Sequence, residues 1–158
     1  WAPMYRFFVI GRSAFAEGVG ERLQPVELET PYFLILKPNS HVSTGQIFTD
    51  KHLTRDTPPI KISHALSLGG RNDCLNVVMK HNPEVNEAYL WLKNHGDAKL
   101  TGTGACLFLS FDNQQDAERL RASTPDKWQA WVCQGCNLSP THIALNQWIE
   151  KNKGLLAN

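Results

Sequence analysis

The sequence predicts an α+β protein of the ferredoxin-like type, a split β-α-β sandwich. The first observation is the order of the expected elements from residue 32 onward, which is strand, helices, strand, strand, helix, strand. The second is that apolar runs of strand length alternate with segments whose apolar residues recur at helical spacing. The third is the length of 158 residues, which suits one domain with a single core.

Composition describes an ordinary globular chain, with 42% hydrophobic and 20% charged residues. A net charge of +1 gives no electrostatic reason to expect a nucleic-acid partner or an anionic membrane. No apolar run approaches the roughly 20 residues that span a bilayer, and nothing resembles a signal peptide. We therefore expect a cytoplasmic protein that binds neither nucleic acid nor membrane.

The first strands are read from apolar runs and alternation. Residues 7–10 form a continuous apolar run, which predicts a buried strand. Residues 14–20 follow, and residues 21–28 alternate apolar with polar side chains. Pro25 predicts an edge strand or a bulge there, because proline cannot donate to a strand ladder. The clearest strand is residues 32–37, which lies between two prolines.

Helices are predicted between this strand and the next. Ser43 and Thr44 offer an N-cap for a short helix to about Lys51, with Ile47 and Phe48 as its apolar face. Three more helical segments are expected. They cover residues 62–68, a stretch from residue 75 that is capped by Asn72 and Asp73, and a longer helix over residues 83–94.

The second half of the chain completes the pattern. Strands are expected over residues 98–101, 106–111 and 128–137, with an amphipathic helix over 113–122 that buries Ala117 and Leu120. Residues 144–158 predict an added terminal helix.

A glycine-rich loop joins two of these strands. Gly102 and Gly104 stand one residue apart in Lys99–Cys106, and glycine is used where the backbone needs a positive φ or a close approach. Successive N–H groups in such a loop can form an anion-binding concavity. From spacing alone, a simple hairpin turn between two strands remains the alternative.

Cysteine and histidine patterns argue against a metal site. Cys133 and Cys136 have C-x-x-C spacing, but no second pair accompanies them, and the strand alternation around them places their sulfurs on opposite faces. We expect the four thiols to be reduced and buried or half-buried. The six histidines show no metal-ligand spacing, and His41 alone lies near a candidate ligand-binding turn.

Three segments, in this order and spacing, carry a family resemblance: Ser13–Glu21, Leu100–Cys106 and Asn137–Pro140. They resemble the 4-diphosphocytidyl-2-C-methyl-D-erythritol kinase family of the GHMP kinases. The resemblance covers only the C-terminal half of such an enzyme. It implies a GHMP kinase C-terminal domain over residues 7–145 and a C-terminal helical extension over 146–158. Residues 1–6 do not match and are interpreted as an artificial junction or an aberrant start.

The resemblance implies a kinase that uses ATP and Mg²⁺ to phosphorylate the 2-hydroxyl of its substrate, in non-mevalonate isoprenoid biosynthesis. The family's phosphate loop is absent, and the position of its catalytic Asp falls on Met4. We therefore expect no catalytic residue here, no ATP or Mg²⁺ bound to this chain, and no activity without the N-terminal lobe. Self-association through the exposed lobe interface is expected.

The resemblance also implies the binding residues. Phe48 matches an aromatic that stacks on the cytosine ring, although an ordinary core phenylalanine is the alternative. Thr44 and Gly45 lie in the same substrate-facing turn, and Val19 matches a position that lines the cytidine pocket. The glycine-rich third motif, near the phosphate end of the ligand, comprises Thr101, Gly102, Thr103 and Gly104.

Two other functions remain open from the sequence. One is a free-standing ferredoxin-like module that binds a small anionic ligand with the glycine-rich loop. The other is a zinc or redox protein that uses Cys133 and Cys136.

Overall fold

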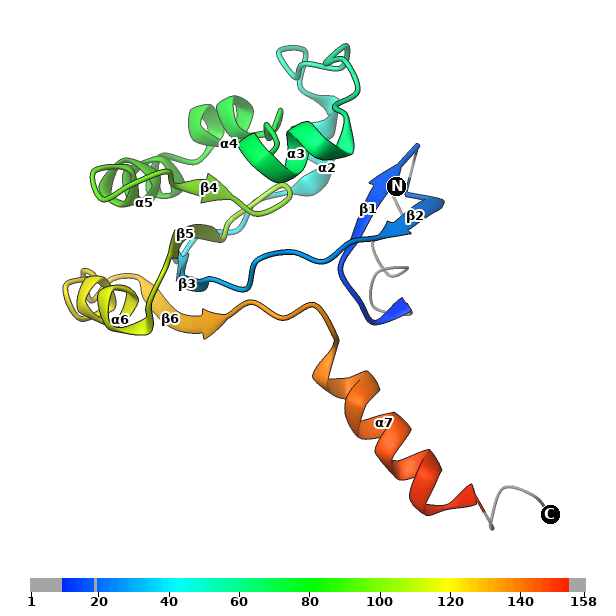
Figure 1. The fold of residues 1–158 in the computed structure, drawn as a ribbon. Helices are drawn as coiled ribbons and strands as arrows, with labels where there is room; N and C mark the ends of the chain where they lie inside the picture. Colours follow the sequence, from blue (N-terminus) through cyan, green and yellow to red (C-terminus); the bar gives the residue numbers. More distant parts are fainter. Residues whose placement is uncertain (1–9, 19, 154–158) are drawn as a thin grey trace. The chain divides into compact units, whose positions relative to one another are not determined.

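The structure is a computed structural model that describes residues 10–18 and 20–153, with the side chains of residues 66–68 left out. The chain divides into two compact units (Figure 1). One unit comprises residues 31–135, and the other combines residues 10–30 with residues 136–153 of the described chain. The expected domain boundaries at residues 7, 145 and 146 stay predictions.

The larger unit is built on a four-stranded antiparallel sheet. Its strands are β3 (Tyr32–Lys37), β4 (Lys99–Leu100), β5 (Leu107–Phe111) and β6 (Gln129–Gln134). The spatial order is β4-β5-β3-β6, so the first strand of the unit lies between the third and the fourth. This order is that of a ferredoxin-like sheet, and the predicted α+β fold class is confirmed.

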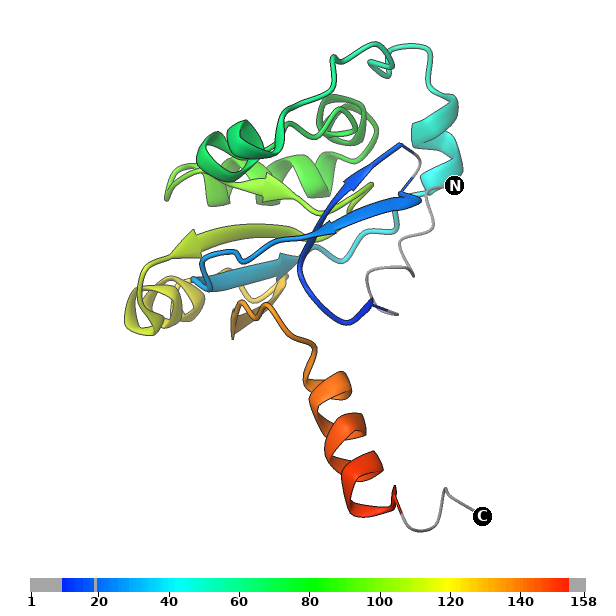
Figure 2. The same ribbon diagram turned by 45° about the vertical axis from the view of Figure 1, so that its right-hand side comes forward.

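Five helices occupy the two crossovers of this sheet (Figure 2). Between β3 and β4 the chain forms α2 (Thr44–Thr49), α3 (Ile62–Leu68), α4 (Leu75–His81) and α5 (Pro83–Lys93). Between β5 and β6 it forms α6 (Gln114–Ala122), whose N-cap Asn113 accepts a 2.9 Å hydrogen bond from the N–H of Asp116. Proline starts α5 because the first helical N–H needs no partner within the helix.

One face of the sheet carries the core. Leu34 and Leu36 of β3 and Leu107 of β5 are fully buried, together with helix residues such as Val85 and Leu92. Every buried apolar residue among those described lies between residues 34 and 128, within the larger unit. Complete burial of one such side chain stabilises the fold by about 1.5–3 kcal/mol. This core fixes the strands and helices that carry the site.

The smaller unit consists of a hairpin and a helix. β1 (Ala14–Glu17) pairs antiparallel with β2 (Arg22–Pro25), and Pro25 ends the edge strand opposite Ala14 as predicted. α7 (Pro140–Lys151) follows a short segment that bridges back to Arg12 through Leu138.

Two expected elements differ from the structure. The terminal helix begins at Pro140 rather than Ala144, because Ser139 stands at the N-cap and proline suits the first turn. Asn72 and Asp73 do not stand at the N-cap of α4, which is Cys74. The strand expected over residues 7–10 lies outside the described residues except for Ile10, which is exposed.

Candidate functional site

The glycine-rich loop is a tight connection between β4 and β5. The N–H of Thr101 donates to the carbonyl of Cys106 at 2.9 Å, and the N–H of Gly104 donates to the carbonyl of Thr101 at 2.8 Å. Gly102 has a φ of +48° and Gly104 a φ of +92°, conformations that side-chain-bearing residues adopt rarely. The hairpin turn expected as one alternative is therefore present, and its glycines are required by the backbone.

The tip of this loop leaves backbone donors open. Among the described residues, no acceptor faces the N–H groups of Gly102 and Thr103. A Cβ placed on Gly102 would meet nothing within 4 Å, so the space beside this peptide is empty. Two neighbouring free N–H groups beside open space can donate hydrogen bonds to one anionic oxygen.

Asn72 fixes the loop from the other side. Its Nδ2 donates to the carbonyl of Leu100 at 3.0 Å and to the carbonyl of Gly102 at 2.8 Å. Its Oδ1 accepts from the N–H of Cys74 at 3.0 Å, which ties the loop to the start of α4. The Asn72 amide therefore bonds two carbonyls of the loop and none of its N–H groups.

Helix α2 contacts the same loop through a pair of hydroxyl groups. Thr44 Oγ1 lies 3.0 Å from Thr103 Oγ1. Phe48 stands four residues after Thr44, so both side chains lie on one face of the helix. Phe48 is 56% exposed as a residue, whereas the neighbouring Ile47 is 1% exposed and packs in the core. An exposed aromatic ring thus lies one helical turn from the loop contact.

Several hydrogen bonds brace this short helix. Ser43 Oγ accepts from the N–H of Gln46, which confirms the predicted N-cap, and Thr49 Oγ1 donates to the carbonyl of Gly45 at 2.8 Å. Arg55 closes the other end by donating to the carbonyls of Phe48 at 2.7 Å and Asp50 at 3.1 Å. α2 has only six residues, so the Arg55 guanidinium group, and not further helical turns, bonds the carbonyls at its C-terminal end.

Asp50 extends this support to α4. Its carboxylate accepts from the N–H of His52 at 2.7 Å and lies 2.5 Å from Nε2 of His81. The hydrogen bond from the His52 backbone, followed by that from His81, holds the pKa of Asp50 below its ordinary value of 3.8. The charged carboxylate is therefore the form that joins the end of α2 to α4.

The structure brings most of the predicted residues into one region. Thr44 contacts the loop directly, and Gly45 is exposed in the first turn of α2. Phe48 was expected on the apolar face beside Ile47, and this was wrong: Ile47 is buried, whereas Phe48 lies on the exposed face of Thr44, four residues earlier. Val19 lies outside the described residues.

Asn72 is the residue that sequence reasoning missed. An Asn-Asp pair ahead of an apolar helical pattern is typical of a helix cap, and that reading hid its contact with a loop 30 residues later. Its amide could have been suspected only from a need to satisfy the carbonyls of a glycine-rich loop.

The thiols differ in part from expectation. Cys74 and Cys106 are half-buried, but Cys133 and Cys136 are exposed, which corrects the expectation that all four are sheltered. Cys133 points outward from β6, and Cys136 follows the end of that strand. Burial, followed by the nearby negative charge of Asp73, raises the pKa of the Cys74 thiol. In the described residues, no three His, Cys, Asp or Glu side chains gather as metal ligands would.

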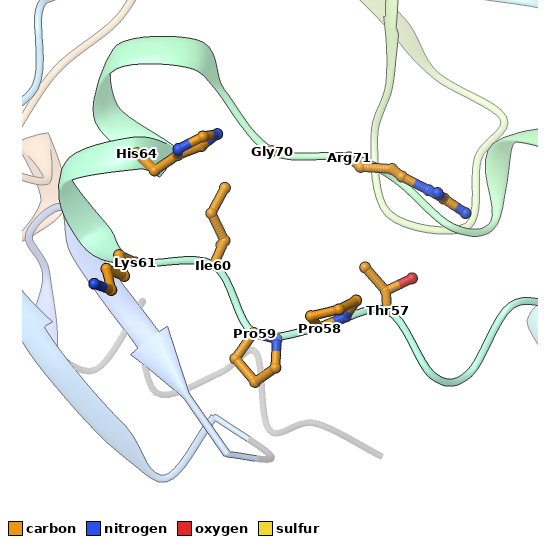
Figure 3. Close-up of a pocket in the computed structure, with 8 residues that line it drawn as sticks. All are labelled: Thr57, Pro58, Pro59, Ile60, Lys61, His64, Gly70 and Arg71. Carbon is orange, nitrogen blue, oxygen red and sulfur yellow. The ribbon is translucent and has the colours of Figure 1, made fainter.

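A separate hollow of about 460 Å³ lies between the segment before α3 and the turn before α4. Figure 3 shows Ile60 extending into it, while the side chains of Lys61 and Arg71 point away from its centre. Arg71 is paired with Asp73 at 2.7 Å. The residues that line it are Thr57, Pro58, Pro59, Ile60, Lys61, His64, Gly70 and Arg71. None of the predicted site residues is among them.

Comparison with known proteins identifies the larger unit. Residues 59–130 match the family model described as GHMP kinases C terminal. This stretch of the chain is similar to the C-terminal domain of GHMP kinases. The matched residues run from before α3 to β6, so they include Asn72 and the glycine-rich loop.

Curated relatives extend this match over most of the chain. A 4-diphosphocytidyl-2-C-methyl-D-erythritol kinase of Marinomonas sp. (strain MWYL1) is 80% identical over 148 residues, which are 94% of this chain and 48% of the relative. The kinase of that name from Ectopseudomonas mendocina (strain ymp) is 51% identical, over 91% of this chain and 50% of the relative. The predicted resemblance is confirmed, and the chain spans about half the length of these relatives.

A solved structure supports the fold. A crystal structure of 4-(cytidine 5'-diphospho)-2C-methyl-D-erythritol kinase superposes with a TM-score of 0.59, over 82% of this chain and 52% of that chain, at 24% identity. Within residues 10–18 and 20–153, no helix has the length and apolar character needed to cross a bilayer.

Proposed function

We propose that this chain is the substrate-side part of an ATP-dependent kinase that phosphorylates the 2-hydroxyl of 4-diphosphocytidyl-2-C-methyl-D-erythritol. The single observation that carries the proposal is the placement of the exposed Phe48 ring one turn from the contact between Thr44 and the glycine-rich loop. A flat apolar ring and a set of free N–H groups suit a ligand with a base at one end and phosphates at the other.

The loop takes the phosphate end of the ligand in this proposal. The N–H groups of Gly102 and Thr103 would donate to a diphosphate oxygen, and the empty space beside Gly102 admits it. The third-motif residues Thr101 and Gly104 hold the loop in this shape through their mutual hydrogen bond. Preorganised donors of this kind stabilise charge without reorganising when the ligand arrives.

The cytosine end is assigned to Phe48. Stacking of a base on an aromatic ring contributes about 1–3 kcal/mol, and it requires an exposed ring face. Thr44 and Gly45 are proposed to contact the substrate beside it, and Val19 to line the cytidine pocket. Arg55 donates to the backbone carbonyl of Phe48, so the backbone that carries the ring loses less freedom when the base stacks.

ATP, Mg²⁺ and the catalytic base are assigned to the remainder of the enzyme. The loop donors fit a phosphate oxygen, but the described residues offer no group of three His, Cys, Asp or Glu side chains for a divalent ion, so the Mg²⁺ ligands are assigned to the N-terminal half. This chain's part is to bind and orient the substrate so that its hydroxyl oxygen faces the transferred phosphoryl group. A cytoplasmic location belongs to the proposal, supported by four free thiols.

The test is an ATP-dependent phosphorylation assay on two samples. The first is this chain alone, and the second joins the N-terminal half of the Marinomonas relative to it. We expect turnover of 4-diphosphocytidyl-2-C-methyl-D-erythritol only by the joined chain, and an increase in KM of about 5- to 150-fold with Phe48→Ala. The matched control is Trp131→Ala, another exposed aromatic, which should leave KM unchanged. Turnover by this chain alone, or an unchanged KM with Phe48→Ala, contradicts the proposal.

A further inference from the structure

The described part of the smaller unit has strands and a helix but no buried apolar core. Among its described residues, Gly11 alone is buried, and no apolar side chain is. The larger unit contains every buried apolar residue that the structure describes. Strands and helices that form no core among themselves must pack their apolar side chains against another part of the protein.

Its elements are too short to persist alone. β1 and β2 form a two-stranded hairpin of four residues each, and an isolated hairpin is marginally stable at best in water. α7 has 12 residues, and isolated helices shorter than about 12–15 residues are marginal in water as well. Tertiary packing is what normally stabilises such elements.

α7 carries an unpaired apolar stripe. Leu145 and Trp148 are three residues apart, so they share a helix face, and they are 49% and 54% exposed. Ile149 adjoins them at the next position of the same stripe and is half-buried. None of the residues in α7 is buried.

The start of α7 is nevertheless firmly placed. The N–H of Ser139 donates to the carbonyl of Gly11 at 2.8 Å, and the N–H of Ser13 donates to the carbonyl of Asn137 at 3.0 Å. Gly11 has a φ of +70° and touches the His142 ring so closely that no Cβ would fit. Asn137 also exchanges hydrogen bonds with the backbone of Leu28 at 2.9 and 2.7 Å. These contacts join segments more than 100 residues apart into one unit.

We propose that residues 10–30 and 136–153 belong to a second lobe, and that the N-terminal half of the kinase relatives covers the Leu145–Trp148 stripe. The length of polypeptide supports this occupant: the chain spans 48% of the Marinomonas relative, and its matched family model is the C-terminal one. That model, at residues 59–130, lies wholly within the larger unit. The larger unit is then the complete C-terminal domain, and the helix at the end of the chain serves the other lobe.

The test compares amide hydrogen exchange in this chain with exchange in the chain joined to the N-terminal half of the Marinomonas relative. In this chain alone, α7 should exchange far faster than α5. In the joined chain, α7 should be protected roughly tenfold or more beyond this chain alone, while α5 stays unchanged. The readout needs no turnover, so failure of this proposal is distinct from failure of the proposed function.

Two variants of the joined chain identify the contact. Trp148→Glu should abolish the added protection of α7, whereas Trp131→Glu, on β6 of the larger unit, should not. The proposal is overturned if α7 exchanges equally fast in both chains, or if Trp148→Glu leaves its protection intact. It is also overturned if α7 is already protected in this chain alone in a concentration-dependent way, because a second copy would then be the cover.

Discussion

Thr44 and Thr103 are 59 residues apart in the chain, yet their hydroxyl oxygens lie 3.0 Å apart. Thr44 begins the helix that carries Phe48, and Thr103 is at the tip of the glycine-rich loop. One hydrogen bond therefore links the two parts of the candidate site, and it sets the distance between the ring and the loop donors.

Removing this bond should loosen the loop without unfolding the domain. Thr44→Val and Thr103→Val each delete one hydroxyl while keeping the side-chain shape, and each should reduce stability by about 0.5–1.5 kcal/mol. Because the two act through one contact, the double variant should be less destabilised than the sum. Urea unfolding of the parent, the two single variants and the double variant measures the four free energies of unfolding that this comparison needs. Thr124→Val, whose hydroxyl bonds Leu120 in α6, should add to either of them without coupling.

Asn72 should matter through its amide nitrogen more than through its oxygen. Asn72→Asp keeps the acceptor for the Cys74 N–H but removes the donors to Leu100 and Gly102 and places negative charge beside their carbonyls. We expect a loss of about 1–3 kcal/mol in the free energy of unfolding and faster amide exchange in residues 101–105.

The control for this change is Asn82→Asp, whose amide donates to Val78 within the same stretch of helices. Asn82→Asp should lower the free energy of unfolding less than Asn72→Asp does, and it should leave amide exchange in residues 101–105 unaltered. If amide exchange in residues 101–105 were equal in the two variants, Asn72 would not be the residue that fixes the glycine-rich loop.

The two loop glycines should respond differently to alanine. Gly104→Ala meets a φ of +92° and contacts at 3.4 Å with Leu100 and Val42, so it should destabilise the domain by about 1–3 kcal/mol. Gly102→Ala meets open space at a φ of +48° and should cost about 1–2 kcal/mol from conformation alone. It should nevertheless weaken CDP binding, because its methyl group occupies the ligand's approach. Thermal unfolding and CDP titration of both variants separate the effects.

Asp50 should make stability depend on acid pH. Its folded-state pKa lies below 3.8, so its stabilising contribution is full above about pH 3.8 and is lost as the pH falls through the lower folded-state value. Asp50→Asn should therefore unfold at lower urea than the parent at pH 6, and the difference should shrink as the pH falls below 3.8. A difference that stays constant with pH would show that the carboxylate charge is not what braces α2.

The sequence predicts most of the larger unit because local patterns and packing agree there. The apolar run of Tyr32–Lys37 becomes the central strand, and Val85, Ala88 and Leu92 at helical spacing all reach the core. Periodicity does not decide between adjacent apolar residues on the short helix α2: Ile47 reaches the core, and Phe48 is exposed.

The candidate site is less accessible to sequence reasoning. The loop and the Phe48 turn are recognisable by resemblance, but the bond between them comes from Thr103, and the loop itself is held by Asn72. Both residues are remote in sequence from their partners. The smaller unit is harder still, because Asn137 bonds Leu28 across 109 residues and no local pattern encodes such a pairing.

The most direct test of the central claim is CDP titration of this chain followed by NMR shifts of its backbone amides. The account predicts that the largest shifts fall on Gly102, Thr103 and the residues around Phe48, and that Phe48→Ala weakens binding by about 5- to 150-fold while Trp131→Ala does not. Shifts confined to other surfaces, such as the hollow lined by Ile60 and His64, would contradict it.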